Sequence, residues 1–353
     1  MAVIHWFPFW KHGKENMKAA RVVIYFIVVS IIILTWKMIG QSTPEPKLLT
    51  SCEGIQQQLN SLMASVELSG GLGNLMFQYS FLYVTCKTYG YQMVLPSTIE
   101  LDNLKDTFGI NVSDSEKEDW DKSLTEKCFQ VIEDEWDCAY DAKLVEKSRR
   151  NVHYKGYFQS WKYLVKYEDD LREMFRFRPH ILNLAASILH KAISSKINVF
   201  NNTGVQPTLV GVHVRRGDVL NDKLFVKYGY KVADYAYLKK AMAYFRNKFS
   251  NVLFIVCSND LKWVRAEFGT TSDVFITKGN TPATDMALLS MTNHTIMTVG
   301  TFGWWISFLT NGETIYYKYP FVPGSPLSKQ FRDNTGTHLY PHWVGMEGDE
   351  TIS

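Results

Sequence analysis

The sequence lacks the features that mark several protein classes. Its 353 residues include only five cysteines and no CxxC pair, so there is no zinc-cluster motif. Lysine and arginine number 38 against 35 aspartate and glutamate residues, too even a balance to indicate nucleic-acid binding. No internal repeat or low-complexity tract is present, which excludes a repeat architecture. A site for an anion must therefore come from a few positioned cations.

The composition is that of a folded protein. Hydrophobic residues make up 46% of the chain and aromatic residues 14%, which argues against disorder. A chain of this length is too long for one ordinary core and fits two domains of about 150 residues each.

One long uncharged run lies near the N-terminus, from Val22 to Trp36. As a helix it spans about 22 Å, short for a bilayer but extendable to Gly40 if Lys37 reaches the interface. Basic residues precede the run, at Lys11, Lys14, Lys18 and Arg21. The sequence therefore predicts a cytoplasmic tail (1–21), a transmembrane anchor (22–40) and a lumenal body. The alternative is a cleaved signal peptide, although no small-x-small site follows the run.

Two further features fit a lumenal body. Sequons for N-glycosylation stand at Asn111, Asn201 and Asn293. In an oxidising compartment Cys128 and Cys138 are near enough in sequence to pair. The alternative, that all five cysteines are buried thiols, stays open.

The rest of the chain divides into a stem (41–62) and two domains (63–205 and 206–353). In the first domain we expect a strand in Met63–Leu68, a helix over Asn74–Tyr89 and a second strand in Gln92–Pro96. Residues 100–200 are charged and aromatic, and their pattern is mostly helical.

From Thr208 onward, apolar strand-like runs alternate with amphipathic segments of helical period. Strands are expected at 208–214, 251–258, 273–276, 294–300 and 314–317, with helices at 234–249, 259–268, 284–291 and 302–310. Such alternation is typical of a doubly wound parallel sheet, so the fold class is α/β.

The sharpest local signal is the segment GVHVRRGDV, which places four polar side chains at the end of a buried strand: His213, Arg215, Arg216 and Asp218. Open α/β sheets bind ligands at that edge. Two adjacent arginines fit a pyrophosphate, because guanidinium groups bind phosphate oxygens in a bidentate manner. The alternative is a surface turn with an internal ion pair.

Two strand-to-helix junctions add to this signal. In SGGLGN (69–74), Gly71, Gly73 and Asn74 could let backbone N–H groups approach an anion, although a simple tight turn explains a lone glycine cluster equally well. In VGTFGWW (299–305), Thr301 and the backbone around Phe302 and Gly303 could hold a phosphate edge. The adjoining Trp304 and Trp305 are better explained as core residues.

Two acidic features have competing interpretations. Asp285 begins a helix, where the helix dipole favours an acid, and it could instead accept the N–H groups of a guanine base. The run EDEWD (133–137) has D-x-x-D-like spacing but lies outside any expected strand end. We interpret it as a solvated face, so no metal site is predicted.

Taken together these motifs resemble a known family. LSGGLGNLMFQY, VGVHVRRGDV, LFIVCSND, DMALLSMTNHTIMTVGTFG and GETIYY stand in the order and spacing of the galactoside 2-α-L-fucosyltransferases. The resemblance runs from about Leu68 to the C-terminus and is densest from Thr208 to Tyr319. HVRRGD alone is shared with α1,6-fucosyltransferases, whereas NHTIMTVGTFG is specific to the α1,2 family.

The resemblance implies a Golgi enzyme with two Rossmann-like domains, a B-type glycosyltransferase. It would move L-fucose from GDP-β-L-fucose to the 2-hydroxyl of a terminal β-galactose, with inversion and without a metal or other cofactor. The GDP-fucose donor would sit on 206–353 and the glycan acceptor on 63–205.

The resemblance also suggests residue roles in the site. Arg215 would bind the β-phosphate with Arg216 in support, His213 would lie beside the nucleotide, Asp285 would face guanine and Thr301 a phosphate.

The general base is not assigned by this resemblance. In α1,6 relatives a glutamate follows HVRRxD, whereas this chain has Asp222 and no glutamate at the matching place. Asp218 is a catalytic candidate, either as the base or as the group that orients an arginine. A different acceptor sugar or linkage, or a membrane-tethered glycan-binding pseudoenzyme, stays open as an alternative function.

Overall fold

The computed structural model describes residues 61–95, 97–110, 127–196, 206–332 and 334–348. The tail, the anchor, almost all of the stem and two of the sequons, Asn111 and Asn201, lie outside these ranges. Within them, no helix has the length and apolar character needed to span a bilayer. The third sequon residue, Asn293, is exposed, and its Oδ1 accepts a hydrogen bond from the Leu209 backbone N–H.

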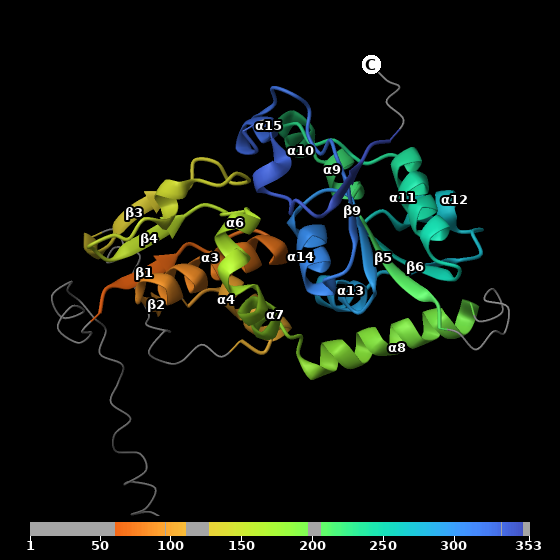
Figure 1. Ribbon diagram of the computed structural model, residues 1–353, viewed down its shortest axis with the longest axis horizontal. Coiled ribbons are helices and arrows are strands. Elements are labelled where there is room, and N and C mark those ends of the chain that lie inside the picture. Colours follow the sequence, from red (N-terminus) through yellow and green to blue (C-terminus); the bar gives the residue numbers. More distant parts are fainter. Residues whose placement is uncertain (1–60, 96, 111–126, 197–205, 333, 349–353) are drawn as a thin grey trace, which may run out of the picture. The chain divides into compact units, whose positions relative to one another are not determined.

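The first part of the described chain forms a four-stranded parallel sheet in the order β2-β1-β4-β3 (Figure 1). Its strands are β1 (Met63–Val66), β2 (Gln92–Val94), β3 (Gln130–Glu133) and β4 (Val152–Lys155). The helices of this part are α3 (Leu72–Tyr89), α4 (Ile99–Thr107), η2 (Ala142–Val145), α6 (Trp161–Leu164), η3 (Val165–Tyr167) and α7 (Glu168–Met174). The expected strands and helix between residues 63 and 96 are confirmed.

The second part forms a six-stranded parallel sheet in the order β10-β9-β8-β5-β6-β7. Its strands are β5 (Thr208–Val214), β6 (Val252–Ser258), β7 (Val274–Ile276), β8 (His294–Met297), β9 (Thr314–Tyr317) and β10 (Val344–Met346). Counted from β5, this is the 3-2-1-4-5-6 order of dinucleotide-binding folds. The expected doubly wound sheet is confirmed, and β10 is an additional edge strand.

Helices cover both faces of the second sheet, because alternate strand residues point to opposite sides. On one face Val210, Val212 and Phe254 pack against α11 (Tyr235–Lys248) and α12 (Leu261–Phe268). On the other, Leu253 and Ile255 belong to the core that includes α13 (Pro282–Ser290) and α14 (Thr301–Thr310). The remaining elements are α9 (Gly217–Asn221), α10 (Lys223–Tyr228), α15 (Pro326–Gln330) and η5 (Thr335–Thr337).

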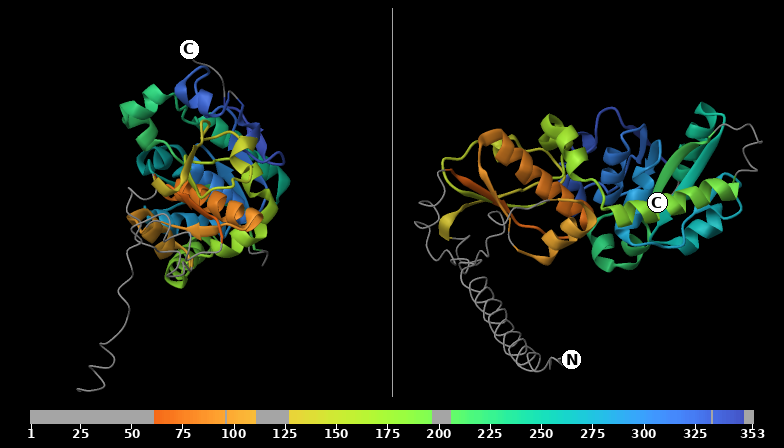
Figure 2. Two further views of the ribbon diagram at one scale, coloured as in Figure 1. Left: turned by 90° about the vertical axis from the view of Figure 1, so that its left-hand side faces the viewer. Right: turned by 90° about the horizontal axis from the view of Figure 1, so that it is seen from below.

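The two parts share one hydrophobic core, which contains residues of both sheets. The long helix α8 (Pro179–Lys196) follows the first sheet in sequence but packs against α13 and β6 of the second (Figures 1 and 2). The late segment 338–343 returns to this core, where Tyr340 packs against Trp161 and Trp304. Trp304 and Trp305 are fully buried, which confirms them as core residues.

The mostly helical interpretation of residues 100–200 is incomplete, since strands β3 and β4 lie there. β4 is buried and pairs with β1 and β3 in parallel. β3 is an edge strand with three exposed residues out of four. A short strand with so little burial carries no alternation of apolar and polar residues, so its sequence gives no strand signal.

The structure contradicts the suggested disulfide between Cys128 and Cys138. Cys128 takes part in a disulfide bond, whereas Cys138 is a buried free thiol. The Cys138 Sγ donates a hydrogen bond to Gln159 Oε1 at 3.3 Å, inside the fold. The alternative of five buried thiols is wrong as well.

The N-termini of α3 and α14 meet at Gly73. A Cβ atom on Gly73 would lie 2.7 Å from the Thr301 carbonyl carbon and 2.8 Å from the Phe302 nitrogen. Both are backbone atoms, which cannot move aside as the end of a flexible side chain could. Only glycine therefore allows this approach of the two helices.

We expect Gly73→Ala to destabilise the protein by about 1 to 3 kcal/mol, the usual cost of overpacking a filled interior. Gly109→Ala is the matched control, because no atom lies within 4 Å of the added Cβ there and the residue lies outside the helices. Its effect should stay within about 0.5 kcal/mol. Urea unfolding of both variants measures the difference, and equal midpoints would contradict the proposed close contact.

Candidate functional site

A cavity of about 720 Å³ lies between the two sheets. From the second sheet it is lined by the segments that follow β5 and β8, including Arg215 and 298–301. These strands are neighbours whose connections run in opposite directions, and the crevice outside such a pair is where open α/β sheets bind ligands. The position of the cavity therefore marks it as the candidate ligand site.

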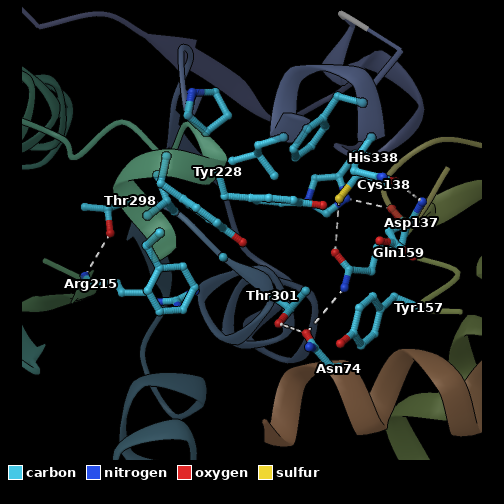
Figure 3. Close-up of a pocket in the computed structure, with 18 of the residues that line it drawn as sticks. Asn74, Asp137, Cys138, Tyr157, Gln159, Arg215, Tyr228, Thr298, Thr301 and His338 are labelled. Carbon is cyan, nitrogen blue, oxygen red and sulfur yellow. Dashed lines mark hydrogen bonds between the residues drawn. The ribbon is translucent and has the colours of Figure 1, made fainter. Parts of the chain in front are cut away.

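Arg215 is a fixed cation that lines this cavity. Its backbone N–H donates to Thr298 Oγ1 at 2.9 Å, which ties the ends of β5 and β8 together (Figure 3). Its guanidinium donates through Nε to Asp218 Oδ2 at 2.9 Å, and Nη2 lies 2.8 Å from the same oxygen. Within the described chain no hydrogen bond of Nη1 is found, so Nη1 is available to a ligand.

A glycine makes room for this guanidinium. Gly300 has φ +94°, and a Cβ at this position would lie 2.6 Å from Arg215 Nη1. Gly300 is also the N-cap residue of α14, followed by Thr301. A cation and the positive end of a helix therefore line the same part of the cavity, a combination suited to a phosphate group.

Asp218 orients Arg215. Its second oxygen, Oδ1, accepts a hydrogen bond from Asn259 Nδ2 at 2.6 Å. Burial raises the pKa of the Asp218 carboxyl, but the hydrogen bond and charge of Arg215 and the bond from Asn259 outweigh burial, so its pKa lies below the ordinary value. The carboxyl is therefore ionised and fully engaged, and it does not line the cavity.

Arg216 points elsewhere. Its guanidinium lies 4.4 Å from the centre of the Trp263 ring, and its Nε is 3.6 Å from Asp260 Oδ2. Neither Arg216 nor these partners line the cavity. The two adjacent arginines, expected to act together, thus have different partners, and of the two Arg215 alone lines the cavity.

Four of the predicted residues line the cavity: Gly71, Asn74, Arg215 and Thr301. Thr301 Oγ1 donates to Asn74 Oδ1 at 2.7 Å, and Gln159 Nε2 donates to the same oxygen at 3.3 Å. Asn74 thus links the first helix of one sheet to the site-forming helix of the other (Figure 3).

The other predicted residues lie behind the cavity wall. His213 is buried beneath Phe302, with ring centres 5.1 Å apart, and a Cβ on Gly303 would lie 2.9 Å from His213 Nδ1. Burial, and then the charge of Arg215, lowers the pKa of His213 to about 3, so the ring is neutral. Gly73 serves the helix contact described above.

Asp285 lies outside the cavity lining, in the first turn of α13. It accepts a hydrogen bond from Asn280 Nδ2 at 2.7 Å, and burial raises its pKa.

The interpretation of the acidic run 133–137 as a solvated face fits Glu133 and Glu135, which are exposed, but is wrong for Asp137. The run begins at Glu133, the last residue of β3, and Asp137 is half-buried and lines the cavity. Asp134 is also half-buried and accepts hydrogen bonds from the backbone N–H groups of Trp136 and Phe158. Recognition of β3 would have placed both acids at a strand end.

Other lining residues were missed because they come from loops, from the short helix α10 and from the C-terminal segment. They are chiefly aromatic and polar: Tyr157, Gln159, Phe225, Tyr228, Tyr230, Phe331 and His338. Within the described residues, no group of three or more His, Cys, Asp or Glu side chains is placed to hold a metal ion.

Comparison with known proteins assigns the family. A family model described as glycosyl transferase family 11 matches residues 28–347. The chain is 30% identical to galactoside alpha-(1,2)-fucosyltransferase 2 of Rattus norvegicus, over 90% of this chain and 86% of the relative. It is 33% identical to the protein of the same name from Bos taurus, over 81% of this chain and 80% of the relative.

Among solved structures, the fold is similar to that of fucosyltransferase NodZ from Bradyrhizobium. The identity is 14% and the TM-score 0.45, over 69% of this chain and 92% of that chain. The family match spans both sheets and every segment that lines the cavity. The chain therefore belongs to glycosyl transferase family 11.

Proposed function

We propose that this protein transfers L-fucose from GDP-β-L-fucose to the 2-hydroxyl of a terminal β-galactose, forming an α-1,2 linkage with inversion. The observation that carries the proposal is Arg215, held by Asp218 beside the N-terminus of α14 in a family 11 chain. The names of the relatives support the choice of reaction and acceptor.

The proposed donor site follows from charge. As the bond to fucose breaks, negative charge develops on the departing GDP, and Arg215 with the N–H groups at the start of α14 would stabilise it. Thr301 would contribute its hydroxyl at the same edge, and Asp285 is the proposed partner of the guanine N–H groups. Because these groups supply positive charge without a metal ion, we propose that the reaction needs none.

The two-sheet arrangement fits a B-type glycosyltransferase, with the donor on 206–353 and the acceptor on 63–205. We further propose a single-pass type II protein of the Golgi membrane, anchored by residues 22–40 with its catalytic body in the lumen. The support for this topology is the apolar run and its basic N-terminal flank.

The function is tested by incubating the lumenal body with GDP-fucose and a panel of galactosides, followed by linkage analysis. We expect an α-1,2-fucosyl product on terminal β-galactosides and the same rate in the presence of EDTA. A product that carries fucose on another sugar or at another position would show that the proposed acceptor is wrong. GDP binding without transfer would indicate a glycan-binding protein, and a loss in EDTA that Mn²⁺ restores would contradict metal independence.

Substitutions in the Arg215–Asp218 pair test the donor site. Arg215→Lys keeps the positive charge but loses the planar guanidinium group, which can donate two hydrogen bonds to one phosphate. We expect a loss of about 10² to 10³ in rate. Asp218→Asn should weaken GDP binding about ten- to hundredfold, because one charged hydrogen bond that aligns the arginine is worth about 1.5 to 3 kcal/mol. Calorimetry of GDP binding measures the second effect.

Asp260→Asn is the matched control for Asp218→Asn. It removes the charge next to Arg216, away from the cavity, while asparagine still caps helix α12. GDP affinity should therefore stay unchanged. If Asp218→Asn also kept full GDP affinity but lost turnover, Asp218 would be the base and not the orienting group.

The topology is tested by protease treatment of sealed microsomes. A lumenal body should be spared without detergent and digested with it. Digestion in sealed vesicles would contradict the proposed orientation, and release into the soluble lumen would indicate a cleaved signal peptide.

A further inference from the structure

Transfer to a sugar hydroxyl requires a group that accepts the hydroxyl proton. Among the described residues that line the cavity, two carry carboxyl groups, Asp137 and Asp222, and one carries an imidazole, His338. Asp218 is bound to Arg215 and Asn259 behind the wall. The choice of base therefore lies among three side chains.

Two of the three are committed to structural roles. Asp222 is exposed and is the N-cap of α10, where its Oδ1 accepts the Leu224 N–H at 2.8 Å. His338 is buried, and its Nδ1 lies 2.6 Å from the Gln159 carbonyl oxygen. Burial lowers the pKa of His338 to about 4, although the bond to Gln159 opposes this, so the imidazole is a weak base.

The Asp137 backbone is fixed from two sides. Its N–H donates to Gln330 Oε1 at 2.9 Å, and its carbonyl accepts the Gln159 N–H at 2.8 Å. Within the described chain its carboxyl forms no ion pair, in contrast to Asp218. The cavity thus contains a positioned carboxyl group whose charge is not already neutralised.

Asp137 and Arg215 lie on opposite sides of the cavity, with Thr301 and Asn74 between them (Figure 3). Inversion needs this separation, because the acceptor oxygen attacks the face of the sugar carbon opposite the leaving phosphate. Inverting glycosidases likewise keep their two catalytic groups apart on opposite faces of the sugar.

We infer that Asp137 is the general base of the transfer reaction, an assignment that rests on the proposed function. As the bond from the galactose oxygen to fucose C1 forms, an Asp137 oxygen takes the hydroxyl proton. The bond from C1 to the phosphate oxygen breaks in the same displacement, and its electron pair leaves with GDP beside Arg215. The proton then passes from Asp137 to solvent.

The electrostatic surroundings fit this role. The pKa of Asp137 is raised to about 6 by burial. A hydrogen bond from the Tyr157 backbone N–H acts in the opposite direction but is the smaller effect. A base acts best when its pKa lies near the working pH. The titratable groups that interact with Asp137 are Asp134, Cys138 and Tyr228. Lys227, Tyr157 and His338 line the same cavity, and Arg332 lies over the ring of the neighbouring Trp136.

The test compares Asp137→Asn with wild type in the fucosyl-transfer assay. We expect kcat to fall by about 10² to 10⁴, the usual share of a general base, while the Kd for GDP changes less than about twofold. The plot of kcat/KM against pH should fall below about pH 6 in wild type, where Asp137 becomes protonated, and this limb should be absent in the variant.

Glu135→Gln is the matched control, since Glu135 belongs to the same acidic run but is exposed and outside the cavity lining. It should keep the wild-type rate and the acid limb. An acid limb that is lost in Asp222→Asn but kept in Asp137→Asn, an unchanged rate in Asp137→Asn, or a parallel loss of GDP binding there would overturn the assignment.

The behaviour of the wild-type protein distinguishes a wrong assignment of the base from a wrong proposed function. If wild type uses an acceptor other than a β-galactoside, the proposed acceptor is wrong, and the same variants are compared on the acceptor it does use. A wild-type protein that binds GDP but transfers fucose to no acceptor, water included, overturns both.

Discussion

The contact between the N-termini of α3 and α14 is the constraint on which the cavity depends. Gly73 lets the backbone of one helix reach the backbone of the other, and the Thr301 hydroxyl then donates to Asn74 beside it. Because α3 belongs to the first sheet and α14 to the second, this contact fixes where the two walls of the cavity stand. The same glycine loop was considered from the sequence as an anion-binding turn, yet Gly73 itself acts through packing.

The side of the cavity that contains Arg215, the proposed donor side, was predictable because it is built from local sequence. Strand β5 is a mostly apolar run rich in valine, which favours strands, and Arg215 follows it directly. Its partner Asp218 is only three residues away in sequence. The local pattern did not predict that Arg216 points away from the cavity while Arg215 lines it. The position of Arg216 depends on contacts with Trp263 and Asp260, which come from a distant part of the sequence.

The side that contains Asp137, the proposed acceptor side, was not predictable for a related physical reason. β3 is exposed on the sheet edge, so its residues lack the alternation that marks a half-buried strand, and the sequence pattern places Asp137 in a charged surface run. His338 reaches the cavity from the C-terminal segment, more than a hundred residues from Gln159, its hydrogen-bond partner. Such neighbours arise from tertiary packing alone, which also explains why Cys138 contacts Gln159 and not Cys128.

Two carboxyl groups near one cavity can perform different tasks only if their surroundings push their pKa values apart. Here Arg215 and Asn259 lower the pKa of Asp218, whereas burial raises that of Asp137, which forms no ion pair within the described residues. In the proposed reaction, a guanidinium bound to Asp218 stays beside the leaving phosphate, where its positive charge is needed. Pairing of Arg215 with Asp137 instead would remove both that charge and the proposed proton acceptor for the hydroxyl. The Asp218–Arg215 ion pair would therefore serve both ends of the proposed inverting displacement, although only one of them contacts it.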